Sequence, residues 1–197
     1  SGFVNAGYGE DTLVGGAAGD SWIFQTKEHR QMSAVGCVGL LHLWDHEEGF
    51  NDLMRFNANP DNNIKAGVLL GTGIISSGVR VPFDPAFSVL EEAVSGEGAA
   101  RELRVAAIVG LGIGYTGTNR EDIKDLLIPF VVDGGQPVEI QCLAAHAISL
   151  VFCGTANDDV LEAVLMCLME KTEEQLKDPT IRYLILALGI LALRVRD

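Results

Sequence analysis

Residues Arg104–Gly117 read RVAAIVGLGIGYTG, and four other stretches of the chain align with them. The four begin at Ser33 (SAVGCVGLLHLW), Lys65 (KAGVLLGTGIISSG), Gln141 (QCLAAHAISLVFCG) and Ile181 (IRYLILALGILAL). The alignment gives one column of small residues (Gly39, Gly71, Gly110, Ala147, Ala187) and a second column two places later (Leu41, Gly73, Gly112, Ser149, Gly189), in which the leucine is the one exception. Successive copies lie 32, 39, 37 and 40 residues apart, which indicates a repeat protein.

One copy also contains a pattern that is typical of nucleotide-binding loops. Gly112, Gly114 and Gly117 spell G-x-G-x-x-G, as in a dinucleotide-binding βαβ unit. An acidic residue, Asp133 or Glu139, follows downstream. However, the copy that begins at residue 141 keeps small residues without the glycines at these places, and bulky residues follow at once. A nucleotide loop occurs once per site, whereas a packing requirement recurs in every repeat. We therefore expect no nucleotide cofactor.

Repeated small residues let neighbouring helices approach closely, so these copies are predicted to be the stacked inner helices of a solenoid. The segments between them would supply the second helix of each pair. The predicted fold is all-α, an α-solenoid of helix pairs that occupies residues 1–197 as a single repeat domain. The approximate repeats are 1–32 (partial), 33–64, 65–103, 104–140, 141–180 and 181–197 (partial), with FVNAGYGED near the N-terminus as the tail of an earlier copy.

The segments between the copies have the features of amphipathic helices. Their predicted starts are two capping boxes (Thr118 with Glu121, Thr155 with Asp158) and an N-cap followed by proline (Asp84, Pro85). The apolar stripes predicted to be buried are Ile123, Leu126, Leu127 and Phe130 in one segment, and Leu161, Val164, Leu165 and Leu168 in another.

The composition is that of a globular, acidic protein. Of the 197 residues 48% are hydrophobic and 21% charged, and the formal net charge is −13. Such a charge argues against nucleic acid as a partner and favours partners that present Lys and Arg. No apolar run is long enough for a membrane span, so no membrane partner is expected. The four cysteines (Cys37, Cys142, Cys153, Cys167) show no C-x-x-C pairing, so we expect core thiols in a reducing compartment, the cytoplasm or the nucleus.

The histidines give only weak signals for chemistry. His42 and His46 are four residues apart with Glu47 and Glu48 beside the second, but a third clear metal ligand is missing. We expect His42 to pack beside Trp44 as a partly buried residue. A packed or hydrogen-bonded role is expected for the histidine at position 146. No Ser-His-Asp or Cys-His arrangement follows from the spacing, so the sequence favours neither a metal site nor an enzyme.

Several phrases of the chain resemble a known family. NAGYGEDTLV, LLHLWDHEEG, KAGVLLGTGIISSGV, GLGIGYTGTNRED and MEKTEEQLKDPTIRYLILALGIL are similar to proteasome/cyclosome repeats. These repeats occur in the two large scaffold subunits of the proteasome base and in one subunit of the anaphase-promoting complex. The resemblance covers nearly the whole chain and implies a fragment of a toroid, because the chain ends inside what should be an inner helix.

The resemblance also implies a non-catalytic docking platform in ubiquitin-dependent protein degradation, beside the base ATPases. In this family an outer-helix site binds ubiquitin and the ubiquitin-like domains of shuttle receptors. Its central acidic positions correspond to Asp159, Met166 and Glu170, of which the methionine is a departure. Asp122 and Asp125 on the preceding outer helix would extend the acidic strip. Ubiquitin's recognition surface is an apolar patch ringed by basic side chains, which such a face would complement.

A second site of the family binds the ubiquitin-like domain of a deubiquitinase. The corresponding positions lie in WDHEEGFND and are His46, Glu47, Asn51 and Asp52. An ordinary solvated turn and helix start is the alternative interpretation of this segment. For the whole chain, the alternatives are a purely structural spacer, a related toroid scaffold from the same family and, by the glycine motif alone, a nucleotide-dependent enzyme.

Overall fold

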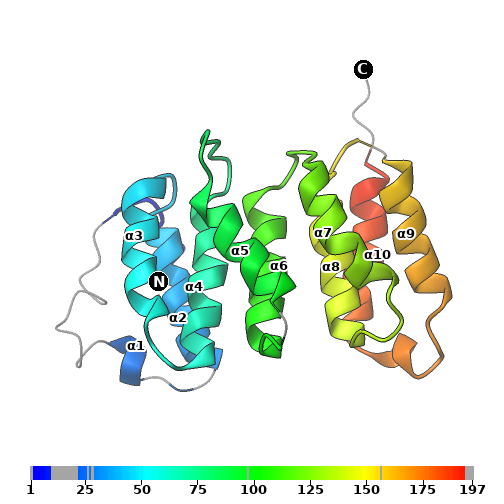
Figure 1. Ribbon diagram of the computed structural model, residues 1–197, viewed down its shortest axis with the longest axis horizontal. Helices are drawn as coiled ribbons and strands as arrows, with labels where there is room; N and C mark the ends of the chain where they lie inside the picture. The colour runs from blue at the N-terminus through cyan, green and yellow to red at the C-terminus, as the bar shows by residue number, and fades with distance from the viewer. Residues whose placement is uncertain are drawn as a thin grey trace. The chain divides into compact units, whose positions relative to one another are not determined.

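The computed structural model describes residues 2–9, 22–25, 27, 29–96, 98–155 and 157–193, and within these ranges every regular element is a helix (Figure 1). The predicted all-α class is confirmed. The helices are α1 (Trp22–Gln25), α2 (His29–Leu41), α3 (His46–Asn57), α4 (Asn62–Ile75), α5 (Pro85–Ser95), α6 (Arg101–Gly114), α7 (Glu121–Val132), α8 (Val138–Val151), α9 (Asp158–Met169), η1 (Gln175–Lys177) and α10 (Ile181–Leu191). In the described ranges no helix has the length and apolar character needed to cross a membrane.

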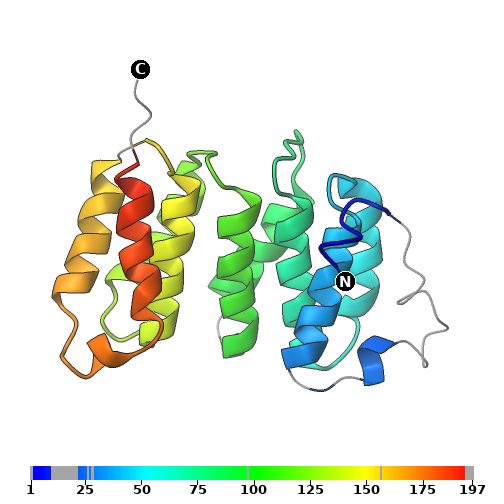
Figure 2. The same cartoon turned by 180° about the vertical axis from the view of Figure 1, so that it is seen from behind.

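The chain divides into two compact units, Ser1–Gly110 and Leu111–Asp197, and the division falls inside α6. In the first unit α2 and α4 lie side by side, and α3 packs on both (Figure 2). Its core contains Ile23, Ala34, Val35, Val38, Leu53, Ile64, Val68 and Ile75. In the second unit α8 lies beside both α7 and α10, and α9 packs against α7 and α10. Helices thus pair and stack within each unit as in an α-solenoid.

Neighbouring inner helices touch through their backbones at the two columns of small residues. A Cβ atom at Gly39 would lie 2.6 Å from the carbonyl oxygen of Gly71, and one at Gly73 would lie 2.4 Å from the Cα of Gly110. Both distances are far below van der Waals contact, so neither place admits a side chain. The small residues are therefore a requirement of helix packing, as the sequence predicts.

The glycine motif is explained by the same packing. Gly112 lies inside α6, and a Cβ there would lie 2.9 Å from the Cα of Ala147 on α8. Gly117 lies in the following loop with a φ of 68°. Gly112 and Gly114 are thus helical residues, and Gly114 is the last residue of α6. They form no loop that could surround a phosphate.

Residues 2–9 make the same contacts as a stretch 110 residues further along the chain. The bonds are Gly7 N–H to Leu40 C=O (3.0 Å) and Gly9 N–H to Leu41 C=O (2.9 Å), against Gly117 N–H to Leu150 C=O (2.9 Å) and Asn119 N–H to Val151 C=O (3.1 Å). In both cases a loop donates two hydrogen bonds to the end of the next inner helix. Segment 2–9 thus occupies the place of a post-helix loop, while the repeat boundaries themselves stay a prediction.

The three predicted helix starts have different outcomes. Asp84 is confirmed as an N-cap, since its carboxylate accepts a hydrogen bond from the N–H of Phe87 at 3.0 Å, and Pro85 is the first helical residue. The capping box at Thr118 is wrong. Its hydroxyl donates to the carbonyl of Tyr115 at 2.7 Å, and the N-cap of α7 is Arg120. The loop runs two residues further than predicted because it must reach the end of α8.

The capping box at Thr155 is also wrong. The Thr155 hydroxyl donates to the carbonyl of Phe152 at 2.8 Å, and Asn157 caps α9 by accepting from the N–H of Val160 at 3.1 Å.

The buried stripes also differ from the prediction. In α7 Ile123 and Leu127 are buried as expected, and Val131 continues the stripe. In α9 the buried residues are Val160, Val164 and Cys167, whereas Leu165 is 41% exposed. Because α9 is apolar on more than one side, the pattern of leucines alone did not identify the buried face.

The close approach at Gly73 predicts a large difference between two Gly→Ala substitutions. We expect Gly73→Ala to lower the free energy of unfolding by about 1–3 kcal/mol, because the methyl group would overpack the contact with Gly110. Gly189→Ala is the matched control in α10, since among the described residues no atom lies within 4 Å of a Cβ there. It should raise stability by up to about 1 kcal/mol through helix propensity. Urea unfolding followed by circular dichroism measures both, and equal effects would contradict the packing explanation.

Candidate functional site

The outer face of α9 contains the predicted acidic and apolar positions. Asp159 is 77% exposed at the side chain, Met166 is 51% exposed, and Glu170 is exposed at the C-cap. At 3.6 residues per turn these three positions fall on one side of the helix, away from the buried Val160 and Val164. The structure therefore brings the three predicted residues together on one accessible surface.

Three further residues belong to this face, and sequence reasoning missed them. Leu165 is 41% exposed, Met169 is 83% exposed, and Glu162 is exposed beside Met169 on the helical wheel. We define the α9 surface as Asp159, Glu162, Leu165, Met166, Met169 and Glu170. The surface combines three apolar side chains with three carboxylates. The sequence contained a signal for this apolar face, since Leu165 and Met169 are four residues apart and so lie on the same side of a helix. The prediction missed it because it assigned the leucine to the core.

Asp122 on α7 is already paired within its own unit. Its carboxylate accepts hydrogen bonds from Arg120 Nε at 3.0 Å and Arg120 Nη2 at 2.5 Å. This bidentate pairing holds the pKa of Asp122 below its usual value. The guanidinium also lies 4.8 Å from the centre of the Tyr115 ring. Asp122 therefore adds less free negative charge to the strip than its sequence position suggests.

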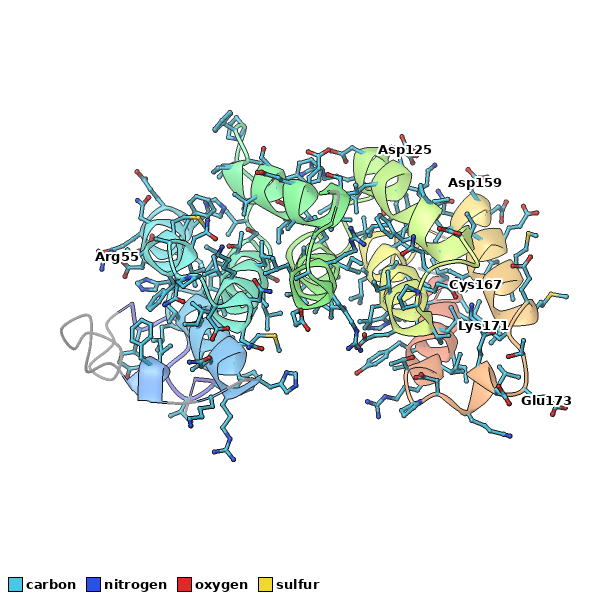
Figure 3. The ribbon with its side chains drawn as sticks, turned by 60° about the horizontal axis from the view of Figure 1, so that its bottom comes forward. Arg55, Asp125, Asp159, Cys167, Lys171 and Glu173 are labelled. Atoms are coloured by element: carbon cyan, nitrogen blue, oxygen red, sulfur yellow. The ribbon has the colours of Figure 1, made fainter. Side chains whose placement is uncertain are left out.

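Lys124 joins the two outer helices of the second unit. Its ammonium group pairs with Glu121 on α7 and lies 3.7 Å from a carboxylate oxygen of Asp159 on α9. The hydrogen bond with Glu121 raises the pKa of Lys124, and the charges of Asp159 and Asp125 add to this effect. Figure 3 shows Asp125 and Asp159 on the same side of the unit. Lys124 therefore places a largely buried cation among the carboxylates of the predicted acidic strip, which sequence reasoning did not include.

The second predicted surface lies at the start of α3. His46 is the first helical residue, and its ring stacks on that of Phe50 with centroids 6.2 Å apart and planes 5° apart. Glu47 is exposed in the first turn, and Asn51 is exposed one turn later. These three residues remain accessible. Asp52 differs from them, because it lies on another side of the helix.

Asp52 lies on the inward side of α3 and has a structural role there. It accepts a hydrogen bond from His42 Nε2 at 3.1 Å and pairs with Arg55 at 3.0 Å. His42 is only 3% exposed, and α3 covers it so closely that a Cβ at Gly49 would lie 2.5 Å from the His42 Cβ. The expectation that His42 is only partly buried is wrong. Its expected neighbour Trp44 takes a φ of 75°, and the side chain of Trp44 is 72% exposed.

The expected core position is confirmed for Cys142 and Cys167, which are buried, whereas Cys37 and Cys153 are only partly buried. The ring of His146 lies 5.6 Å from that of Tyr183, and partial burial lowers the pKa of the histidine. Burial raises the pKa of Cys142 to about 11, which makes its thiol a poor nucleophile at neutral pH. The described residues contain no group of three or more His, Cys, Asp or Glu side chains that could hold a metal ion.

Comparison with known proteins gives consistent relatives. The chain is 40% identical over 191 residues to 26S proteasome regulatory subunit rpn1 of Schizosaccharomyces pombe, and 34% identical over 191 residues to the rpn-1 subunit of Neurospora crassa. It is 36% identical over 198 residues to 26S proteasome non-ATPase regulatory subunit 2 homolog B of Arabidopsis thaliana. These matches cover 95%, 96% and 97% of the chain but only 21%, 21% and 22% of the relatives. No protein-family model matches the chain.

The buried contact of Asp52 generates a prediction about stability. Asp52→Ala would leave His42 Nε2 buried without its acceptor, and we expect it to lower the free energy of unfolding by about 1–3 kcal/mol. Asn51→Ala, on the exposed side of the same helix, should change it by less than about 0.5 kcal/mol. Thermal and urea unfolding of the two variants measure the difference. An Asp52→Ala variant as stable as the unmodified chain would contradict this stabilising role.

Proposed function

This chain belongs to the family that includes 26S proteasome regulatory subunit rpn-1 and 26S proteasome non-ATPase regulatory subunit 2, and from that premise we propose that it is a docking scaffold. The chain spans about a fifth of the length of these relatives. Its proposed role is to bind ubiquitin and the ubiquitin-like domains of shuttle receptors, as a non-catalytic part of the proteasome base beside the base ATPases. The proposed location is the cytoplasm and the nucleus, and the proposed process is ubiquitin-dependent protein degradation.

The observation that carries this proposal is the composition of the α9 surface. Leu165, Met166 and Met169 are exposed side by side on an outer helix. Contiguous exposed apolar side chains are a feature of interaction sites, and methionines adapt to partners of different shape. The carboxylates around them suit a partner whose apolar patch has basic neighbours, as the recognition surface of ubiquitin does.

The proposed mechanism is equilibrium docking. A bound shuttle receptor would hold its substrate close to the proteasome and so raise the local substrate concentration. Lys124 on α7 contacts Asp159 on α9 and so links the α9 surface to the neighbouring outer helix. A rigid helix face loses little conformational freedom on binding, which favours affinity.

The second surface, at the start of α3, is proposed to bind the ubiquitin-like domain of a deubiquitinase. His46, Glu47 and Asn51 support this role by their accessibility. The internal contacts of Asp52 argue that it stabilises α3 and contributes little to binding.

A purely structural spacer is the second candidate function. The exposed face of α10 favours it, since Ile185 and Leu186 are more than half exposed and Gly189 lies in open space among the described residues. Such a face suits packing against another helix. Both functions could coexist, because the α9 surface and this face of α10 use different residues.

We predict that a charge reversal or the loss of an apolar side chain on the α9 surface weakens docking. Isotope-labelled ubiquitin, and in parallel a shuttle-receptor ubiquitin-like domain, would be titrated with the chain and followed by NMR. Shifts at the apolar patch of ubiquitin should weaken by at least about tenfold in Glu170→Arg and in Met169→Ser, in line with the loss of an interface anchor. Both substitutions are on exposed positions and should leave stability unchanged.

The matched control is Glu91→Arg, which makes the same charge change on an exposed position of α5. It should bind like the unmodified chain, which separates local contacts from the overall charge of −13. If neither domain shifts with the folded, unmodified chain, the docking function at α9 is refuted and the spacer remains.

A further inference from the structure

Trp44 has a backbone conformation that is rare for a large side chain. Its φ is 75°, in the left-handed region where glycine is favoured. Trp44 is the third residue after the end of α2, and the third residue after α4, α6 and α8 also has positive φ. In those three loops the residue is glycine (Gly78, Gly117, Gly154). The loop after α2 thus holds a tryptophan where equivalent loops use glycine.

Burial does not account for this tryptophan. The side chain is 72% exposed, so the indole gains little from leaving water. One part of the ring lies against the backbone of Gly7, where a Cβ would be 3.6 Å from the indole Cζ3. Most of the ring remains in solvent. Residues in strained conformations cluster at functional sites, so the exposed position of Trp44 points to a role at the surface.

The neighbours of Trp44 define the chemistry of that surface. Tyr8, which follows Gly7, is 77% exposed and adds a second aromatic ring. Asp45, Glu47 and Glu48 are exposed directly after the tryptophan, and Asp45 fixes the loop by accepting a hydrogen bond from the N–H of Glu48 at 3.3 Å. We call these five residues the Trp44 surface. It presents two aromatic rings with three carboxylates beside them.

We propose that Trp44 is the anchor residue of the second docking surface, and that its exposed indole face receives an apolar patch with a lysine or arginine at its edge. The occupant we propose is a small ubiquitin-like domain, because an apolar patch with basic neighbours complements both the rings and the carboxylates. Tryptophan is among the residues that most often dominate binding energy at interfaces. This inference rests on the proposed docking function of the α3 region and adds the residue on which its affinity depends.

The test uses a substitution that should not harm the fold. Trp44→Gly gives the loop the residue that its three counterparts have, so the melting temperature should stay the same or rise slightly. Binding of the ubiquitin-like domain of a proteasome-associated deubiquitinase would be measured by calorimetry with residues 1–197. We expect the dissociation constant to increase by roughly 30-fold or more in Trp44→Gly. Trp44→Phe keeps a ring and should lose less than about tenfold.

The possible outcomes separate the inference from the proposed function. If the unmodified chain binds the domain and Trp44→Gly binds equally well, the anchor role of Trp44 is refuted while docking at α3 stands. If the unmodified chain does not bind the domain, docking at α3 fails, and the anchor role fails with it. A melting temperature many degrees lower in Trp44→Gly would show that the indole stabilises the loop, which also contradicts the inference.

Discussion

The contact between backbones of neighbouring inner helices is the constraint on which the rest of the structure depends. At Gly39 and Gly73 the next helix leaves no room for a Cβ. An inner helix that packs this closely must therefore have a small residue at the contact, and the outer helices then cover the sides that the inner helices leave open. Outer faces are free of this constraint, which explains why the candidate docking surfaces lie on α9 and around the start of α3 and not on the inner helices.

Most of the fold follows from the sequence, because spacing and residue size are properties of the chain itself. The columns of small residues predicted the inner helices and correctly discounted the G-x-G-x-x-G motif. The errors at the two helix starts have a local origin, because the hydroxyls of Thr118 and Thr155 donate to the carbonyl three residues earlier, and the N-caps are Arg120 and Asn157. In the first of these loops tertiary contacts add to this, since two backbone N–H groups donate to the end of α8.

The candidate surfaces were predicted less completely, since exposure and pairing depend on neighbours that a sequence does not place. Asp159 and Met166 are exposed as expected, but Met169 was not identified and Lys124 was not expected beside Asp159. Asp52 was grouped with accessible residues, although it supports His42. Trp44 is a bulky residue at a place where other repeats have glycine, a difference visible in the sequence, but its positive φ became apparent only in the structure.

The position of Lys124 has a consequence for how salt affects the α9 surface. A partner cation that approaches Asp159 would meet a carboxylate that already has a neighbour 3.7 Å away. Docking at this carboxylate would then be an exchange of one ammonium group for another and not a simple neutralisation. In such an exchange one ion pair of Asp159 replaces another, and added salt screens both the pair with Lys124 and the pair with the partner. Ionic strength would thus act on this surface more weakly than the number of its carboxylates implies.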